Sequence, residues 1–154
     1  MKKLIKHSHC VGESSFHLQF TPAYRQDIFV SEEIKSLVKH YLLEKAEQLK
    51  VFITALGFGP DHLHFFVGNC KNYSAKELAR LFKGYISRMM RKHHSELFSD
   101  KLWGKKFWTA GYFYRGVGVI TAESAEYYIA HSQEKHWKVV DYEIYKQQTL
   151  TTFF

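Results

Sequence analysis

Two histidines separated by one apolar residue are the feature of this chain that most directly suggests chemistry. His62 and His64 flank Leu63 in the run Gly59-Pro60-Asp61-His62-Leu63-His64-Phe65-Phe66-Val67. Side chains alternate between the two faces of a β-strand, so both histidines point to the same face, with Cα atoms roughly 6.5–7 Å apart. Two imidazoles at that spacing can converge on one divalent cation.

The opposite face of the same strand carries Leu63, Phe65 and Val67. The pattern predicts a strand that buries this apolar face and presents the two histidines on the other. A structural zinc site is not indicated, because such sites usually need four Cys or His ligands, and Cys10 and Cys70 are isolated. Two imidazoles leave room for a third protein ligand and for substrate oxygens, as in catalytic sites. The alternative is a half-exposed strand edge in a chain with ten histidines.

Length and composition indicate one domain over residues 1–154 with a substantial core. The chain is 45% apolar and 17% aromatic, which excludes a disordered or low-complexity protein. Its apolar runs are too short to cross a bilayer, and no apolar segment follows the basic first residues, so no signal peptide is expected. Two scattered cysteines are consistent with a reducing cytoplasm.

The formal net charge is +7, and the excess cations are clustered. One group lies between Lys83 and Lys92, and a second follows between Lys101 and Arg115. In residues 101–108 the lysines alternate with Trp103, Phe107 and Trp108. Cations interleaved with aromatic rings favour a polyanionic partner with stackable bases, which is a nucleic acid. The alternative is an ordinary basic surface.

Hydrophobic periodicity and capping residues predict an α+β fold with an antiparallel sheet. Strands are expected at Ser15–Thr21, Val51–Phe58, His62–Gly68 and Gly111–Ile120; helices are expected from Ser31 to Leu49, after the cap Ser74, and from Thr121 to about His136. The order β-α-β-β-α-β matches a ferredoxin-like (RRM-like) sandwich with helices on one sheet face, followed by a terminal helix.

The last predicted helix carries a second group of chemically capable residues. Tyr127, Tyr128, His131 and Gln133 lie within about two turns of it. A tyrosine hydroxyl can attack phosphorus when a metal ion polarises the phosphate. For either tyrosine alone, a packing role is the simpler interpretation. The histidine pair on a ferredoxin-like sheet is the feature that favours a catalytic role for one of the tyrosines.

From about His17 to Trp137 the chain resembles the single-tyrosine HUH transposases of small bacterial and archaeal insertion sequences, including the REP-associated transposases. Pro60-Asp61-His62-Leu63-His64 corresponds to the histidine–hydrophobic–histidine motif, and Phe82-Lys83-Gly84 corresponds to the lysine–glycine helix. The remaining motifs, in order, are Lys101-Leu102-Trp103-Gly104, Phe107-Trp108, Gly111-Tyr112-Phe113 and Tyr128-Ile129 before Gln133.

The resemblance implies an enzyme that binds single-stranded DNA hairpins and cuts at the ends of an insertion sequence. His62 and His64 would hold Mg²⁺ or Mn²⁺ against the scissile phosphate, and Tyr128 would form a 5′-phosphotyrosine and release a 3′-hydroxyl. Another 3′-hydroxyl would then rejoin the DNA without ATP. The family also implies a homodimer that shares its active sites between subunits, located in the cytoplasm and at the nucleoid when acting.

Three assignments stay open at this point. Tyr127 is the alternative nucleophile to Tyr128. The family pattern has Gln four residues after the nucleophile as third metal ligand; here Ser132 takes that place, Gln133 follows it, and His131 is a rival ligand. The candidates for contacts with the DNA backbone and bases are Lys83, Arg88, Arg91, Trp103 and Trp108.

Other functions remain possible on the same fold. A domesticated relative would process chromosomal hairpins without moving an element. A nucleic-acid-binding module without catalysis would need aromatic rings on the central strands, where this chain carries histidines. A metal-dependent phosphohydrolase would use water in place of tyrosine.

Overall fold

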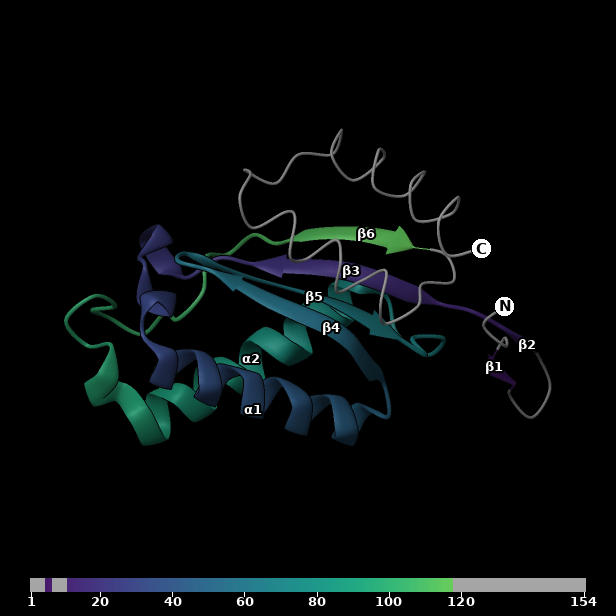
Figure 1. Cartoon of the computed structure of the whole chain (residues 1–154), viewed down its shortest axis with the longest axis horizontal. Coiled ribbons are helices and arrows are strands. Elements are labelled where there is room, and N and C mark those ends of the chain that lie inside the picture. The colour runs from purple at the N-terminus through teal and green to yellow at the C-terminus, as the bar shows by residue number, and fades with distance from the viewer. Residues whose placement is uncertain (1–4, 7–10, 118–154) are drawn as a thin grey trace.

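The structure is a computed structural model that describes residues 5–6 and 11–117 (Figure 1). The predicted last helix, with Tyr127, Tyr128, His131 and Gln133, lies outside the described residues. Within them the order β-α-β-β-α-β is confirmed. A short additional hairpin of β1 (Ile5–Lys6) and β2 (Val11–Gly12) precedes it and was not predicted from the sequence.

The main sheet has four antiparallel strands in the order β4-β5-β3-β6 (Figure 1). Their bounds are Ser15–Phe20 for β3, Phe52–Gly59 for β4, His62–Gly68 for β5 and Phe113–Val117 for β6. The histidine strand β5 therefore lies between β4 and β3. This strand order is the ferredoxin-like arrangement that the sequence predicts.

Two helices cover one face of this sheet (Figure 1). Helix α1 (Glu32–Leu49) begins at Ser31, whose hydroxyl accepts a hydrogen bond from the Ile34 backbone N–H at 3.2 Å. Helix α2 (Ala75–His94) begins with a capping box between Ser74 and Glu77. Each cap satisfies amide groups that the first helical turn leaves without partners, which fixes where the helix begins.

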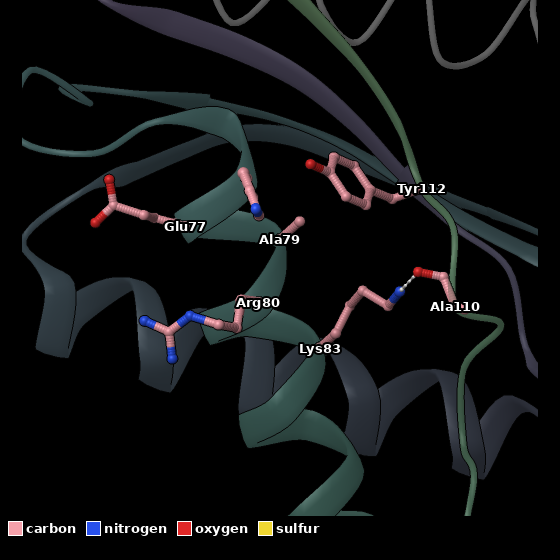
Figure 2. A pocket seen from close by; sticks show the side chains of 7 residues that line it. Glu77, Ala79, Arg80, Lys83, Ala110 and Tyr112 are labelled. Atoms are coloured by element: carbon pink, nitrogen blue, oxygen red, sulfur yellow. Dashed lines mark hydrogen bonds between the residues drawn. The ribbon is translucent and has the colours of Figure 1, made fainter.

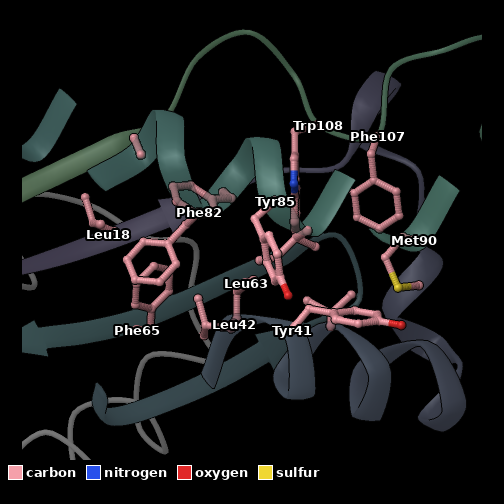
Figure 3. Packing of buried hydrophobic residues seen from close by; sticks show 14 of the residues in the cluster. Leu18, Tyr41, Leu42, Leu63, Phe65, Phe82, Tyr85, Met90, Phe107 and Trp108 are labelled. Atoms are coloured by element: carbon pink, nitrogen blue, oxygen red, sulfur yellow. The ribbon is translucent and has the colours of Figure 1, made fainter. Parts of the chain in front are cut away.

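The core lies between the sheet and the helices (Figure 3). Leu63, Phe65 and Val67 of β5 are buried in it, as the alternation predicts. The rings of Phe65 and Phe82 meet edge to face, with centroids 5.4 Å apart. The buried residues of α2 are Ala75, Leu78, Ala79, Phe82, Tyr85, Ile86 and Met90.

Strand β6 begins at Phe113, two residues later than the predicted start at Gly111. The reason is a competing interaction. The carbonyl oxygens of residues 109–111 accept hydrogen bonds from the Lys83 ammonium, at 2.7, 3.2 and 3.0 Å. The chain therefore follows α2 before it joins the sheet. Residues 118–120 of the predicted strand lie outside the described residues.

The capping box of α2 makes a measurable contribution to stability. Because Ser74→Ala removes the acceptor for the Glu77 N–H, we expect the free energy of unfolding to fall by about 1 kcal/mol in urea denaturation. Ser95→Ala, at the other end of the same helix, is the matched control and should change it much less. Equal losses in the two variants would contradict the capping assignment.

Candidate active site

The histidines lie on the sheet face opposite the helices. His62, His64 and Phe66 alternate with the core residues of β5. The antiparallel pairing with β3 places Gln19 opposite His64, and His17 opposite Phe66. Cross-strand partners share a sheet face, so a third imidazole joins the pair. The His64 ring centroid is 5.5 Å from that of His62 and 5.8 Å from that of His17.

This face is less open than the sequence predicts. His64 is 1% exposed and His17 is fully buried. The His62 side chain, in contrast, is 23% exposed. Both histidines lie on the face that the alternation predicts, but His64 is buried on that face. The rings on this face pack against one another: His17 stacks on Phe66 with ring centroids 4.4 Å apart.

His62 is oriented by the residue before it. The Asp61 carboxylate oxygen Oδ1 lies 3.1 Å from His62 Nδ1, a bond that is made when Nδ1 carries the ring proton. Nε2 then has its lone pair available for a metal ion. Carboxylate partners of this kind fix the tautomer and orientation of metal-binding histidines. The other Asp61 oxygen lies 3.8 Å from Arg25 Nε.

The His62 ring also occupies space that only a glycine leaves open. Gly59 is the cross-strand partner of His62 in the β4–β5 hairpin. A Cβ atom at residue 59 would lie 2.0 Å from His62 Cε1 and 2.6 Å from Nε2. Any side chain at Gly59 would therefore push the ring from this position.

Burial keeps the inner histidines neutral. Desolvation, with a smaller effect of His62, lowers the pKa of His64 to about 3. Burial is also the main reason that the pKa of His17 lies well below its ordinary value, with His64 and Arg115 adding to the effect. Neutral imidazole is the form that binds metals. No proton has to leave His64 before it can act as a ligand at neutral pH.

Buried polar atoms beside the histidine pair lack protein partners among the described residues. Neither ring nitrogen of His64 has a hydrogen-bond partner within the described part of the chain, and the same holds for Gln19 Oε1. Buried acceptors usually have partners, so these atoms fit a bound cation. Among residues 5–6 and 11–117, no three His, Cys, Asp or Glu side chains are grouped closely enough to hold a metal. Both predicted third ligands, Gln133 and His131, lie outside the described residues.

Two of the predicted DNA contacts have protein partners. The Lys83 ammonium donates hydrogen bonds to the carbonyl oxygens of residues 109–111, as described above. Arg91 donates hydrogen bonds to the carbonyl oxygens of Leu102, at 3.0 Å, and of Lys106. Both cations thus attach the segment 102–111 to α2. Burial lowers the pKa of both groups from their ordinary values. A role of either residue in DNA contact stays a prediction.

The other three predicted contacts differ in exposure. Trp108 is 5% exposed and packs in the core against Phe20 and Phe107. Arg88 is exposed, and its guanidinium lies over the Tyr85 ring. Trp103 is 59% exposed and is the aromatic side chain of this set that a base can reach.

A surface pocket of about 560 Å³ lies apart from the histidines (Figure 2). It is formed beside α2 by Lys76, Glu77, Ala79, Arg80, Lys83, Ala110 and Tyr112. Figure 2 shows the Lys83 ammonium directed at the Ala110 carbonyl. Since that cation is already bonded to backbone oxygens, the pocket reflects the packing of residues 109–112 on α2.

Sequence reasoning missed four residues of this site: Gly59, Asp61, His17 and Gln19. Asp61 and Gly59 stand beside the histidine motif, and the hairpin turn they belong to was the available signal. His17 and Gln19 alternate with the apolar residues of Ser15–Phe20, so a polar face was visible. Predicting that this polar face lies beside the histidines of β5 would have required the register between β3 and β5.

With this geometry established, comparison with known proteins decides the family. The family model described as "Transposase IS200 like" matches residues 10–132. The chain belongs to the IS200-like transposases. The transposases of insertion sequence element IS200 from Salmonella typhimurium and Salmonella typhi are each 27% identical to it over 128 residues, covering 83% of this chain and 82% of the relative.

Solved structures show the same fold. A candidate transposase from Deinococcus radiodurans R1 superimposes with a TM-score of 0.66 at 23% identity, covering 75% of this chain and 87% of the other. A REP-associated tyrosine transposase bound to a REP hairpin gives a TM-score of 0.52 at 11% identity, covering 78% and 62%. Membership of the IS200-like transposases gives the protein a transposase role. Among its described helices, none is long and apolar enough to cross a membrane.

If His62 binds Mn²⁺, as proposed below, Gly59→Ala should weaken that binding by on the order of tenfold, because the His62 ring fills the space above Gly59 and other changes to the support of metal ligands have effects of this size. Titration of Mn²⁺ followed by the electron paramagnetic resonance signal of the free ion measures this. Gly116→Ala in β6, where a Cβ would have no atom of the described residues within 4 Å, is the matched control. Unchanged Mn²⁺ affinity in folded Gly59→Ala would contradict the role of His62.

The neutral buried histidines make stability depend on pH. The unfolded chain protonates each histidine below about pH 6.5, whereas folded His64 stays neutral down to about 3. The free energy of unfolding should therefore fall as the pH drops below about 6.5, by up to about 1.4 kcal/mol per pH unit for each such histidine.

Denaturation in the presence of EDTA at several pH values measures this slope. His17→Phe removes one of the two buried histidines and should reduce the slope of the unfolding free energy against pH by about half. His93→Phe changes an exposed histidine of α2 and should leave it as in the parent. A slope that is the same in all three proteins would contradict the burial of neutral histidines.

Proposed function

We propose that this IS200-like transposase cleaves and rejoins single-stranded DNA at insertion-sequence ends through a 5′-phosphotyrosine intermediate. The observation that carries the proposal is the pair His62 and His64 on one sheet face, with the former oriented by Asp61 and the latter buried and neutral. Family membership supports the transposase role itself. The single-stranded substrate and the covalent step are the proposed parts.

The proposed DNA partner is a hairpin at each end of the element. The net charge of +7 favours a polyanion, and the REP-associated relative of the same fold is bound to a REP hairpin. Phosphate contacts from basic side chains would provide affinity that falls with salt. Base contacts would come from exposed rings such as Trp103.

Tyr128 is the proposed nucleophile. Its phenolic oxygen attacks the scissile phosphorus and loses its proton to solvent, while the bond from phosphorus to the 3′ oxygen breaks and that oxygen leaves as a 3′-hydroxyl after taking up a proton. A 3′-hydroxyl of another strand reverses the exchange and frees the tyrosine. Since one phosphodiester is exchanged for another, no nucleoside triphosphate is required.

The proposed metal is Mg²⁺ or Mn²⁺, which when bound neutralises charge on the phosphate oxygens. His62 Nε2 and a ring nitrogen of His64 would hold it, with Gln133 as the proposed third ligand and His131 as its rival. The hydrogen bond from His62 Nδ1 to Asp61 orients the ring with Nε2 as the nitrogen available to a metal ion. The buried face around His64 excludes water, which strengthens electrostatic interactions with the phosphate.

A homodimer with shared active sites is also part of the proposal, as is action at the nucleoid. In such a dimer, Tyr128 of one subunit would complete the histidine site of the other. Mixing His64→Ala with Tyr128→Phe protein then restores one complete site in each mixed dimer. If each site forms within one subunit, both sites of the mixed dimer keep one defect each, so the mixture stays inactive.

The covalent step is tested with labelled single-stranded DNA from the flanks of the element, with Mn²⁺, on a denaturing protein gel. We expect an adduct with the parent and a loss of at least about 100-fold in Tyr128→Phe and His64→Ala, because the first removes the proposed nucleophile and the second a proposed metal ligand. Tyr127→Phe is the matched control and should form the adduct.

The outcomes of this experiment separate the alternatives. Loss of adduct in Tyr127→Phe instead would make that residue the nucleophile. Cleavage without adduct that survives Tyr128→Phe would indicate a phosphohydrolase that uses water. Tight hairpin binding without cleavage in the parent would indicate a binding module, and both of these last results would contradict the proposal.

A further inference from the structure

Two aromatic side chains from distant parts of the sequence stack on each other at the surface. Tyr24 and Trp103 are 61% and 59% exposed. Their ring centroids are 5.0 Å apart, with only 6° between the ring planes. Large aromatic residues are normally buried when a core is available, so an exposed parallel pair needs a reason.

The two segments that carry the rings are held together by backbone and side-chain bonds. The Ala23 N–H donates to the Phe107 carbonyl at 2.9 Å, and the Thr109 N–H donates to the Thr21 carbonyl at 2.8 Å. The Lys101 ammonium lies 2.8 Å from Asp27 Oδ1. The stacked pair thus stands on a preformed support, which lowers the entropy cost of binding to it.

The backbone under Tyr24 is in an uncommon conformation. Tyr24 and Arg25 have φ values of 57° and 52°, in the left-handed region that side chains other than glycine rarely adopt. Two such residues in succession are held by the surrounding bonds, including the Arg25 N–H to the Pro22 carbonyl at 2.9 Å. Conformations of this kind concentrate at functional sites, where they aim side chains.

The same turn connects the pair to the histidine site. Arg25 follows Tyr24, and its Nε lies 3.8 Å from Asp61 Oδ2. Asp61 in turn bonds His62. Lys105 and Lys106 are exposed in the segment that carries Trp103. The surroundings of the two rings are therefore cationic, which favours a negatively charged partner.

We propose that Tyr24 and Trp103 form a stacking platform for an unpaired base of single-stranded DNA, on the strand whose phosphate reaches His62 and His64. The inference rests on the proposed function and adds a binding subsite to it. An unpaired base offers a free π-face, whereas bases inside a duplex are already stacked on their neighbours. The adjacent cations would bind the flanking phosphates.

Stacking and phosphate contacts have different salt dependence, and this provides the test. The probe is a fluorescein-labelled thymidine strand of about 20 nucleotides, which covers the known site sizes of single-strand binders. We expect Trp103→Ala to weaken its binding about tenfold at every salt concentration, with the slope of log affinity against log salt unchanged. Trp103→Tyr should restore most of the affinity. Lys105→Ala should instead reduce the slope by about one.

A matched control and a second probe guard against indirect effects. Phe52→Ala removes a similarly exposed ring (58%) from the start of β4, far along the strand from the Gly59–His62 turn, and should bind as the parent does. A strand with one 2-aminopurine should lose fluorescence on binding the parent but less on binding Trp103→Ala, because a stacked base is quenched. A blunt duplex hairpin should bind the parent and Trp103→Ala equally.

The proposal is overturned if folded Trp103→Ala binds the thymidine strand as tightly as the parent, or if Phe52→Ala loses as much affinity. It is also overturned if the duplex is weakened as strongly as the single strand, since the pair would then contact something other than an unpaired base. If the parent protein forms the Tyr128 adduct and Trp103→Ala binds the thymidine strand normally, only the stacking platform is refuted. If Trp103→Ala weakens binding of the strand but the parent protein forms no adduct, only the proposed function is refuted.

Discussion

The alternation of side chains along β5 is the constraint on which the rest of the structure depends. Leu63, Phe65 and Val67 enter the core on one face, and this fixes His62 and His64 on the other. A shift of register by one residue would place imidazoles in the core and leucine and phenylalanine at the site. The energy of the core therefore also holds the histidines in place, and no separate scaffold is needed.

Much of this could be predicted from the sequence, because the determining signals are local. Period-two alternation located β3 and β5, and the caps Ser31 and Ser74 fixed the starts of both helices. The histidine pair needed only its own strand to be recognised. The family then followed from the order of short motifs, and the comparison over residues 10–132 confirmed it.

What the sequence did not predict depends on contacts between distant segments. His17 reaches His64 only through the pairing of β3 with β5, and Tyr24 meets Trp103 only because residues 21–23 bond to residues 107–109. Lys83 and Arg91 stand on the polar side of α2, and each donates hydrogen bonds to carbonyl oxygens of another segment. No periodicity in one helix could reveal those partners.

The central claim is that the β5 histidines on the sheet face opposite the helices bind the metal. Nuclear magnetic resonance of protein with isotope-labelled histidines, titrated with substoichiometric Mn²⁺, tests it most directly, since a bound paramagnetic ion broadens nearby signals. The account predicts that the ring signals of His62 and His64 broaden first, while those of His40 and His93 on the helical layer stay sharp. Selective broadening of the helical histidines, with sharp His62 and His64 signals, would contradict it.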